Sequence, residues 1–186
     1  MKKSLLLAVL FLAVTNFISL SLKGQTTAVT SKKTEGIKWM SFEEAIALNK
    51  KKPKMIFIDF YTDWCGWCKK MDAETFADKE IVSYINKKYY AVKFNAEQTE
   101  PIIFKEQEFV NPNPDKARST HKLALALLKN EKLYPSFVIL DKNSDWTYKL
   151  KGYKSATDLL PILRFYGDEE YKTLTWGEYL QKKQQP

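Results

Sequence analysis

The residues MIFIDFYTDWCGWCKKMD, Met55–Asp72, join an apolar run to a pair of cysteines. Residues 55–61 are β-branched, aromatic or otherwise apolar with one exception, a pattern typical of a strand that is buried on both faces. The exception is Asp59, whose ionised carboxyl would be costly there unless it is paired. The strand leads directly into the CGWC motif (residues 65–68). The stretch therefore predicts a buried strand that places both sulfurs at the start of a helix.

The spacing of Cys65 and Cys68 suits thiol–disulfide exchange. At the start of a helix, unpaired amide groups and the helix dipole favour the thiolate of Cys65. Cys68 lies within the same first turn, close enough to attack a mixed disulfide formed at Cys65. Gly66 lets a substrate backbone come close, and Trp64 and Trp67 are assigned to the substrate-binding surface. We therefore predict that Cys65 attacks the substrate and that Cys68 resolves the intermediate.

Other uses of the cysteine pair are weighed by counting ligands. A structural zinc site needs four ligands, and His121 is the only other soft candidate in the chain. A copper(I) site needs only two thiolates, so a copper(I)-binding carrier stays as an alternative. An inert disulfide also stays, although a bridge that closes so short a loop constrains the unfolded chain little. Redox exchange is the favoured interpretation, and it needs neither a metal nor another cofactor.

Composition and charge narrow the class of protein. The chain has 186 residues, of which 45% are hydrophobic and 14% aromatic, too apolar for a disordered chain and long enough for one domain. Two cysteines cannot form a disulfide scaffold. The formal net charge is +8, but Arg118 and Arg164 are the only arginines, and no basic stripe with stacking aromatics is present. We expect a monomer that does not bind nucleic acid.

The N-terminal residues resemble a secretory signal peptide. Met1–Lys3 is basic and Ser4–Val14 is almost wholly apolar, the arrangement of an export signal. We place the signal at residues 1–24, with cleavage near Gly24-Gln25, and expect residues 25–36 to form a flexible lead. An uncleaved membrane anchor is the alternative. Without the signal the chain holds 27 basic and 22 acidic residues, a net charge of +5. The protein is thus expected to be exported, most simply to a periplasm.

Local signals predict the remaining elements. Ser41 and Glu44 form a capping box at the start of a helix, and Thr175 and Glu178 form a second one. The other predicted elements are recognised by their apolar spacing and by turn residues. They are a helix at Thr120–Leu128, a hairpin of Ser136–Leu140 with Thr147–Lys151, and a helix at Ala156–Tyr166.

Residues 97–119 precede the helix predicted at Thr120–Leu128. They contain one short apolar element, followed by Asn111-Pro112-Asn113-Pro114, which is typical of a turn-rich loop. We interpret this segment as an insertion, which is either decorative or selects substrates. His121 follows it and is expected to be a surface or helix-capping residue.

These motifs together resemble the thioredoxin family. The similarity rests on the strand and active-site turn already quoted, on Val92-Lys93-Phe94-Asn95, on Tyr134–Leu140, and on Gly152-Tyr153 before a terminal helix. The family has a buried acid six positions before its first cysteine, which is Asp59 here. The Gly-Trp pair between the cysteines is most similar to secreted proteins of the thiol–disulfide interchange group.

The resemblance implies an α/β thioredoxin-like fold, in which helices flank a central mixed sheet. One domain would cover residues 37–186, with the insertion before a cis-proline segment and a C-terminal helical extension at about 167–186.

The resemblance also implies roles for individual residues. Asp59 would take the proton from Cys68, and Lys93 would pair with Asp59 and restrain its pKa. Taken alone, Lys93 is equally compatible with a solvent-facing position. Pro135, in a cis peptide, would present the backbone of Tyr134 to an extended substrate and keep metal away from the sulfurs.

The predicted function is an exported thiol–disulfide oxidoreductase that reduces protein disulfides through a redox-active Cys65–Cys68 pair. Its partners would be disulfide-bonded proteins and, because export separates it from cytoplasmic reductants, an electron-donating membrane protein. A disulfide oxidase or isomerase that uses the same residues is the near alternative. The dipeptide between the cysteines lacks the proline of the family's strong reductants, so the resemblance leaves the potential open.

Overall fold

The computed structural model describes residues 36–184. The predicted signal peptide, and the flexible lead up to residue 35, lie outside these residues. No helix within 36–184 is long and apolar enough to cross a membrane.

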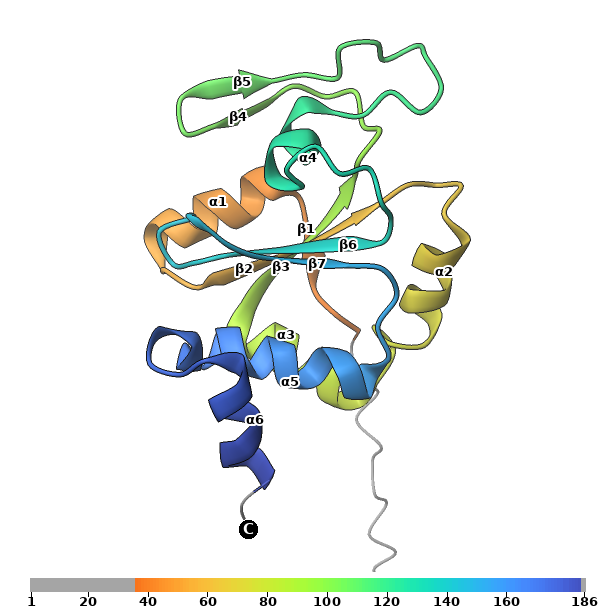
Figure 1. The fold of residues 1–186 in the computed structure, drawn as a ribbon. Coiled ribbons are helices and arrows are strands. Elements are labelled where there is room, and N and C mark those ends of the chain that lie inside the picture. The colour runs from red at the N-terminus through yellow and green to blue at the C-terminus, as the bar shows by residue number, and fades with distance from the viewer. Residues whose placement is uncertain (1–35, 185–186) are drawn as a thin grey trace, which may run out of the picture. The chain divides into compact units, whose positions relative to one another are not determined.

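A five-stranded mixed sheet forms the centre of the described domain (Figure 1). The strand order is β1-β3-β2-β6-β7, with β1 and β2 parallel to β3 and with β6 antiparallel to both of its neighbours. The strands span Trp39–Met40 (β1), Met55–Tyr61 (β2), Tyr89–Asn95 (β3), Ser136–Leu140 (β6) and Trp146–Lys151 (β7). Strand β2 is central, as the apolar run at 55–61 predicts, and six of its seven residues are buried. The short edge strand β1 is not predicted by the sequence.

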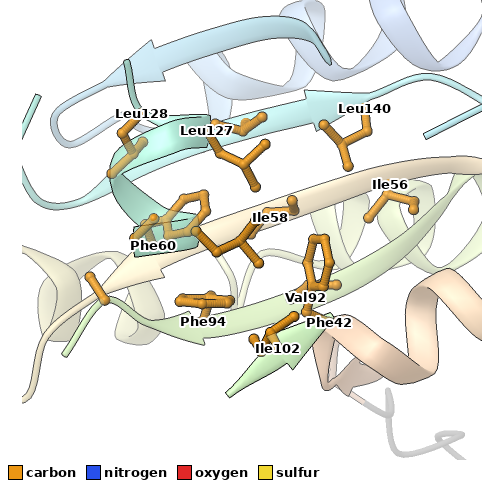
Figure 2. Close-up of a cluster of buried hydrophobic side chains, with 14 of the residues drawn as sticks. Phe42, Ile56, Ile58, Phe60, Val92, Phe94, Ile102, Leu127, Leu128 and Leu140 are labelled. Carbon is orange, nitrogen blue, oxygen red and sulfur yellow. The ribbon is translucent and has the colours of Figure 1, made fainter. Parts of the chain in front are cut away.

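Helices cover both faces of the sheet (Figure 1). On one face, α1 (Phe42–Lys51) and α4 (Lys122–Leu127) pack on Ile56, Ile58 and Phe60 (Figure 2). On the other face, α3 (Lys79–Lys88) and α5 (Ala156–Gly167) pack on Met55 and Phe57. Successive residues of β2 therefore point to opposite cores. Asp59 follows this alternation and points to the same side as Phe57.

The capping signals are confirmed. The Ser41 hydroxyl accepts from the Glu44 amide, and the Glu44 carboxylate accepts from the Ser41 amide, so α1 begins at Phe42. Thr175 and Glu178 exchange the same pair of bonds at the start of α6, Trp176–Gln184. The C-terminal extension also contains a 3-10 turn, η1, at Glu170–Lys172. Its aromatic side chains pack on Phe165 of α5, as expected for an element that docks on the domain.

The insertion is more structured than the sequence indicates. In place of one short apolar element it forms an antiparallel hairpin of β4 (Ile102–Phe104) and β5 (Gln107–Phe109), which lies beside α4 at the top of Figure 1. In the hairpin turn, Lys105 and Glu106 adopt left-handed conformations. Glycine usually occupies such positions, and because neither residue is Gly, the sequence does not indicate this turn. Ile102 is buried against the core, so this strand closes the end of the α1 face.

His121 corrects the expectation of a surface residue. It caps α4, because its Nδ1 accepts from the Leu123 amide at 3.2 Å, but its side chain is fully buried and its ring packs edge-on against Phe94. The capping prediction is confirmed and the surface position is wrong. Burial lowers the pKa of His121, because the charged imidazolium is poorly solvated there.

Candidate active site

Cys65 and Cys68 form a disulfide at the start of α2, Gly66–Ala73. Their Cα atoms are 5.3 Å apart, a separation that a disulfide spans readily. Cys65 is the N-cap of the helix, and its Sγ accepts a hydrogen bond from the Cys68 amide at 3.1 Å. This donor, together with the helix dipole, favours negative charge on the Cys65 sulfur once the pair is reduced. Both side chains are about 95% buried, so access to the sulfurs is restricted.

Asp59 is the buried carboxyl on the face of the sheet that α2 and α3 cover. It is 1% exposed and pairs in register with Lys93 of β3 on one side and Phe137 of β6 on the other. Its Oδ2 accepts from Lys93 Nζ at 2.6 Å, whereas its Oδ1 is buried without a partner. Burial raises the pKa of Asp59 to about 6, although Lys93 opposes the shift. The predicted pairing of Asp59 and Lys93 is present.

Lys93 has a second acidic partner that the sequence did not indicate. Its Nζ also donates to Asp72 Oδ1 on the last turn of α2, so one ammonium bridges the buried and the exposed carboxylates. Burial lowers the pKa of Lys93, but the carboxylates of Asp59 and Asp72 raise it by more. Lys93 therefore stays charged at neutral pH. The alternative in which it faces solvent is wrong.

The Tyr134–Pro135 peptide bond is cis, as the resemblance implies. The Pro135 carbonyl accepts from the Gly152 amide at 2.9 Å, where Gly152 adopts a positive φ of 73°. Within residues 36–184, neither backbone group of Tyr134 is hydrogen-bonded to another backbone group. The Tyr134 ring contacts the ring of Trp64, with centroids 6.2 Å apart, so this segment lies beside the active-site turn. Its unpaired backbone groups are suited to binding an extended chain.

One flank of the disulfide is built around Trp64, and we call it the Trp64 flank. The Trp64 side chain is 53% exposed, and its indole N–H donates to Glu97 Oε1 at 3.0 Å. The guanidinium of Arg118 lies 5.0 Å from the centre of the indole ring, and Tyr134 packs edge-on against it. Glu97 and Arg118 belong to the insertion. The added chain therefore reaches the residue that precedes Cys65.

The other flank, which we call the Trp67 flank, is built around the second tryptophan of the motif. Trp67 is 58% exposed and contacts Tyr153 at 5.6 Å between ring centroids. The ammonium of Lys70 lies 5.3 Å from the Trp67 ring and 5.4 Å from the Tyr153 ring. Glu74 lies 3.9 Å from Lys70 and accepts a hydrogen bond from Tyr153 at 2.6 Å. Gly66, between the two flanks, has open space around it, as expected for close approach of a substrate backbone.

The predicted site residues therefore fall into three layers. The disulfide and Gly66 lie at the helix start, Asp59 and Lys93 belong to adjacent strands below, and the aromatic residues flank the opening. The sequence missed Asp72, Arg118 and Tyr153 as neighbours. No group of three or more side chains that could hold a metal ion is present in residues 36–184.

A family model described as a thioredoxin-like domain matches residues 42–167. The chain belongs to the thioredoxin-like family. Its central mixed sheet, flanking helices and CxxC disulfide are those of a thioredoxin-like oxidoreductase, with an extra C-terminal helix.

Solved thioredoxin-like structures resemble this chain. A thioredoxin-fold protein from Helicobacter pylori is 26% identical over 70% of this chain and 81% of its own, with a TM-score of 0.51. Two others share the fold. A thioredoxin from Thermus thermophilus is 18% identical (70% and 86% covered, TM-score 0.52), and a putative disulphide-isomerase from Bacteroides thetaiotaomicron is 23% identical (73% and 96% covered, TM-score 0.51). A comparison with curated protein sequences gives no match.

Proposed function

We propose that this protein is an exported thiol–disulfide oxidoreductase that reduces disulfides in protein substrates. The observation that supports this most strongly is the Cys65–Cys68 disulfide at a helix start, with the Asp59 carboxyl buried in the adjoining strand at a pKa of about 6. A structural bridge needs no titratable group in the core beside it. A dithiol that must lose and regain protons needs such a titratable group nearby.

The first step is attack of the Cys65 thiolate on one sulfur of a substrate disulfide. A new bond forms between Cys65 and that sulfur, the substrate disulfide breaks, and the second substrate sulfur leaves as a thiolate that takes a proton from solvent. The amide of Cys68, 3.1 Å from the Cys65 sulfur, stabilises the attacking thiolate. The unpaired backbone of Tyr134 holds the substrate chain during this step.

The second step is attack of Cys68 on the Cys65 sulfur of the mixed disulfide. The Cys68 thiol gives its proton to Asp59, directly or through a water molecule; the Oδ1 of Asp59 has no hydrogen-bond partner among the described residues and can accept the proton. At neutral pH the carboxyl is mostly ionised, because its pKa lies near 6. The Cys65–Cys68 bond forms, the bond between Cys65 and the substrate sulfur breaks, and that sulfur leaves as a thiolate that takes a proton from solvent. Two electrons have then passed from the enzyme to the substrate.

A further cycle needs two electrons from another dithiol. Because the N-terminus resembles an export signal, we propose a thiol-bearing membrane protein as the donor. Export is tested by isolating the protein from its native cell and measuring its mass. We expect a chain that begins near Gln25, and a chain that retains residues 1–24 would support the membrane-anchor alternative.

The redox function is tested by separating the two thiols. Cys65→Ser should abolish reduction of a disulfide-bonded test protein, because the attacking thiol is lost. Cys68→Ser should accumulate a mixed disulfide between Cys65 and the test protein, which is seen as a band that a reductant dissolves. The chain has no other cysteine, so each variant leaves a single thiol. Unchanged turnover in Cys65→Ser would rule the function out.

A further inference from the structure

We infer that Arg118 is a specificity-determining residue, which binds a carboxylate beside the substrate cysteine and gives the enzyme a preference for disulfides in acidic segments. This inference rests on the proposed function, because it assigns the substrate class of the same site. It is carried by three observations on the Trp64 flank: the position of Arg118, the absence of an ion pair to Arg118 among the described residues, and the way its loop is held.

Arg118 lies at the opening of the site although it is far from the motif in sequence. Its guanidinium lies 5.0 Å from the ring centre of Trp64, the residue directly before Cys65. The same ring contacts Tyr134, which precedes the cis proline. A substrate chain that reaches the Cys65 sulfur beside Tyr134 therefore passes the exposed Trp64 surface, where Arg118 lies.

No carboxylate within residues 36–184 forms an ion pair with Arg118. Of the acidic residues in its segment, Glu97 accepts the Trp64 indole N–H, and Asp115 lies on the exposed loop. Arg118 also lines a hollow of about 200 Å³ together with Lys116 and Lys132. Two further cations therefore lie near Arg118.

The loop that carries Arg118 is fastened by one buried side chain. Asn111 is 6% exposed, and its amide donates to the carbonyls of Glu97, Gln98 and Ser119. Its carbonyl oxygen accepts from the Asn113 amide and the Ser119 hydroxyl, so both ends of loop 111–119 are tied to the end of β3. Because the backbone beside Arg118 is held before a substrate arrives, binding a carboxylate costs less conformational entropy.

Arginine suits this role better than lysine. Its planar guanidinium can stack on the indole face and still direct two parallel N–H groups at one carboxylate. Because the site is exposed, a single such pair is worth about 0.5 to 1 kcal/mol, or roughly a two- to fivefold preference. The neighbouring cations add to this in proportion to the charge of the substrate, and salt screens the effect.

The test is a competition for Cys65 in the Cys68→Ser protein, which forms a mixed disulfide without resolving it. Two peptides, each with one internal disulfide, are mixed in equal amounts, one with Glu and the other with Gln on both sides of a cysteine. A remote residue makes their masses differ. The ratio of the two adducts is measured by intact mass at early times. We expect the Glu peptide to be favoured about three- to fivefold at low salt and scarcely at all near 1 M NaCl.

Matched variants show whether Arg118 is responsible. Arg118→Gln should bring the ratio close to one, Arg118→Lys should keep part of it, and Arg118→Glu should invert it. Lys70→Gln is the control, because Lys70 lies over the other tryptophan of the motif but has Glu74 beside it. Lys70→Gln should leave the ratio as it is.

Two outcomes would overturn the inference and are distinguishable. Equal adducts with both peptides, or a ratio that Arg118→Gln does not change, would refute the role of Arg118 and leave the proposed function standing. Failure of Cys65 to form an adduct with either peptide would refute the proposed function itself, and the inference with it.

Discussion

The two flanks of the disulfide have similar chemical parts but differ in how their charges are paired. Each contains an exposed tryptophan, a tyrosine and a cation over the indole ring. On the Trp67 flank, Glu74 lies beside Lys70 and bonds Tyr153, so the charge is balanced locally. On the Trp64 flank, the carboxylate of Glu97 binds the indole N–H, and Arg118 has no ion-pair partner among residues 36–184.

The difference has a structural cause. The Trp67 flank is made of α2 and the turn after β7, elements that the fold contains in any case. The Trp64 flank receives Glu97 and Arg118 from the insertion. Residues 97–119 therefore add charged side chains to one side of the opening, whereas the other side is formed without them.

The largest effect on the free energy of unfolding is expected from removing the hydrogen bonds that hold the Trp64 flank. Asn111→Leu removes the amide that joins the carbonyls of Glu97, Gln98 and Ser119 and leaves these groups without their partner. We expect the free energy of unfolding to fall by about 3 to 5 kcal/mol, since the Asn111 side chain makes five hydrogen bonds and each contributes about 0.5–1.5 kcal/mol. Urea unfolding of the oxidised protein measures this. A loss below about 1 kcal/mol would show that the loop is held by other contacts.

The second effect concerns Asp59, which lies beneath both flanks. Its pKa is raised by burial from 3.8 to about 6, so its ionisation is less favourable in the folded chain than in the unfolded one. The associated stability is present below about pH 4 and is lost as the pH rises through 6. The loss amounts to about 3 kcal/mol, at 1.36 kcal/mol for each unit of pKa.

Asp59→Asn removes this titration, so its free energy of unfolding should not show that fall between about pH 3 and pH 8. Both proteins are unfolded with urea across that pH range. The contributions of the other titratable groups cancel when the free energy of unfolding of one protein is subtracted from that of the other. Because Lys93 keeps Asp72 as a partner in the variant, the comparison isolates the Asp59 carboxyl. Parallel curves for the two proteins would contradict the raised pKa.

A smaller effect is expected on the Trp67 flank. The hydroxyl of Thr75, which is 1% exposed, donates to the Lys154 carbonyl at 2.6 Å and holds the turn that carries Tyr153. Thr75→Val removes this single bond, at a cost of about 1 kcal/mol in urea unfolding. Asn111 makes several hydrogen bonds and Thr75 makes one, so Asn111→Leu should lower the free energy of unfolding by more than Thr75→Val does. A loss as large as that of Asn111→Leu would mean that the flanks are held equally.

The smallest effect is expected from the two cations themselves. Arg118→Gln and Lys70→Gln should each lower the free energy of unfolding by less than about 1 kcal/mol, because exposed cation–aromatic contacts and surface ion pairs contribute little. Thermal unfolding measures both. Similar small losses would mean that a change in substrate preference in Arg118→Gln reflects binding. A large loss in one variant alone would give that cation a structural role.

The lower layers of the site are predictable because their signals are local. An acid inside the apolar run 55–61 has no stable place without a partner, and the CGWC motif follows at once. The resemblance then added Lys93 and Pro135, at positions that the sheet register brings beside the active-site strand. The buried position of Asp59 and the helix-start position of the cysteines need only the pattern of a buried strand and the start of a helix, whereas Lys93 and Pro135 rest on the resemblance.

The contacts of the Trp64 flank are not predictable from such local patterns. Arg118 lies on a loop whose two ends Asn111 ties to the chain after β3, and hydrogen bonds between distant segments leave no periodic pattern in a sequence. Asp72 was missed for a similar reason, since its partner lies on a strand and not on its own helix. The turn residues at 111–114 predict a loop but do not indicate which part of the domain the loop contacts.

The redox potential of the Cys65–Cys68 pair tests the central claim most directly. The protein is equilibrated in thiol–disulfide buffers of known potential, and the fraction of reduced protein is measured after trapping of the free thiols. We predict a midpoint near about −270 mV, the value of a thioredoxin-like reductant. A midpoint near about −120 mV would contradict the reducing direction, and a pair that stays oxidised well below about −300 mV would contradict exchange altogether.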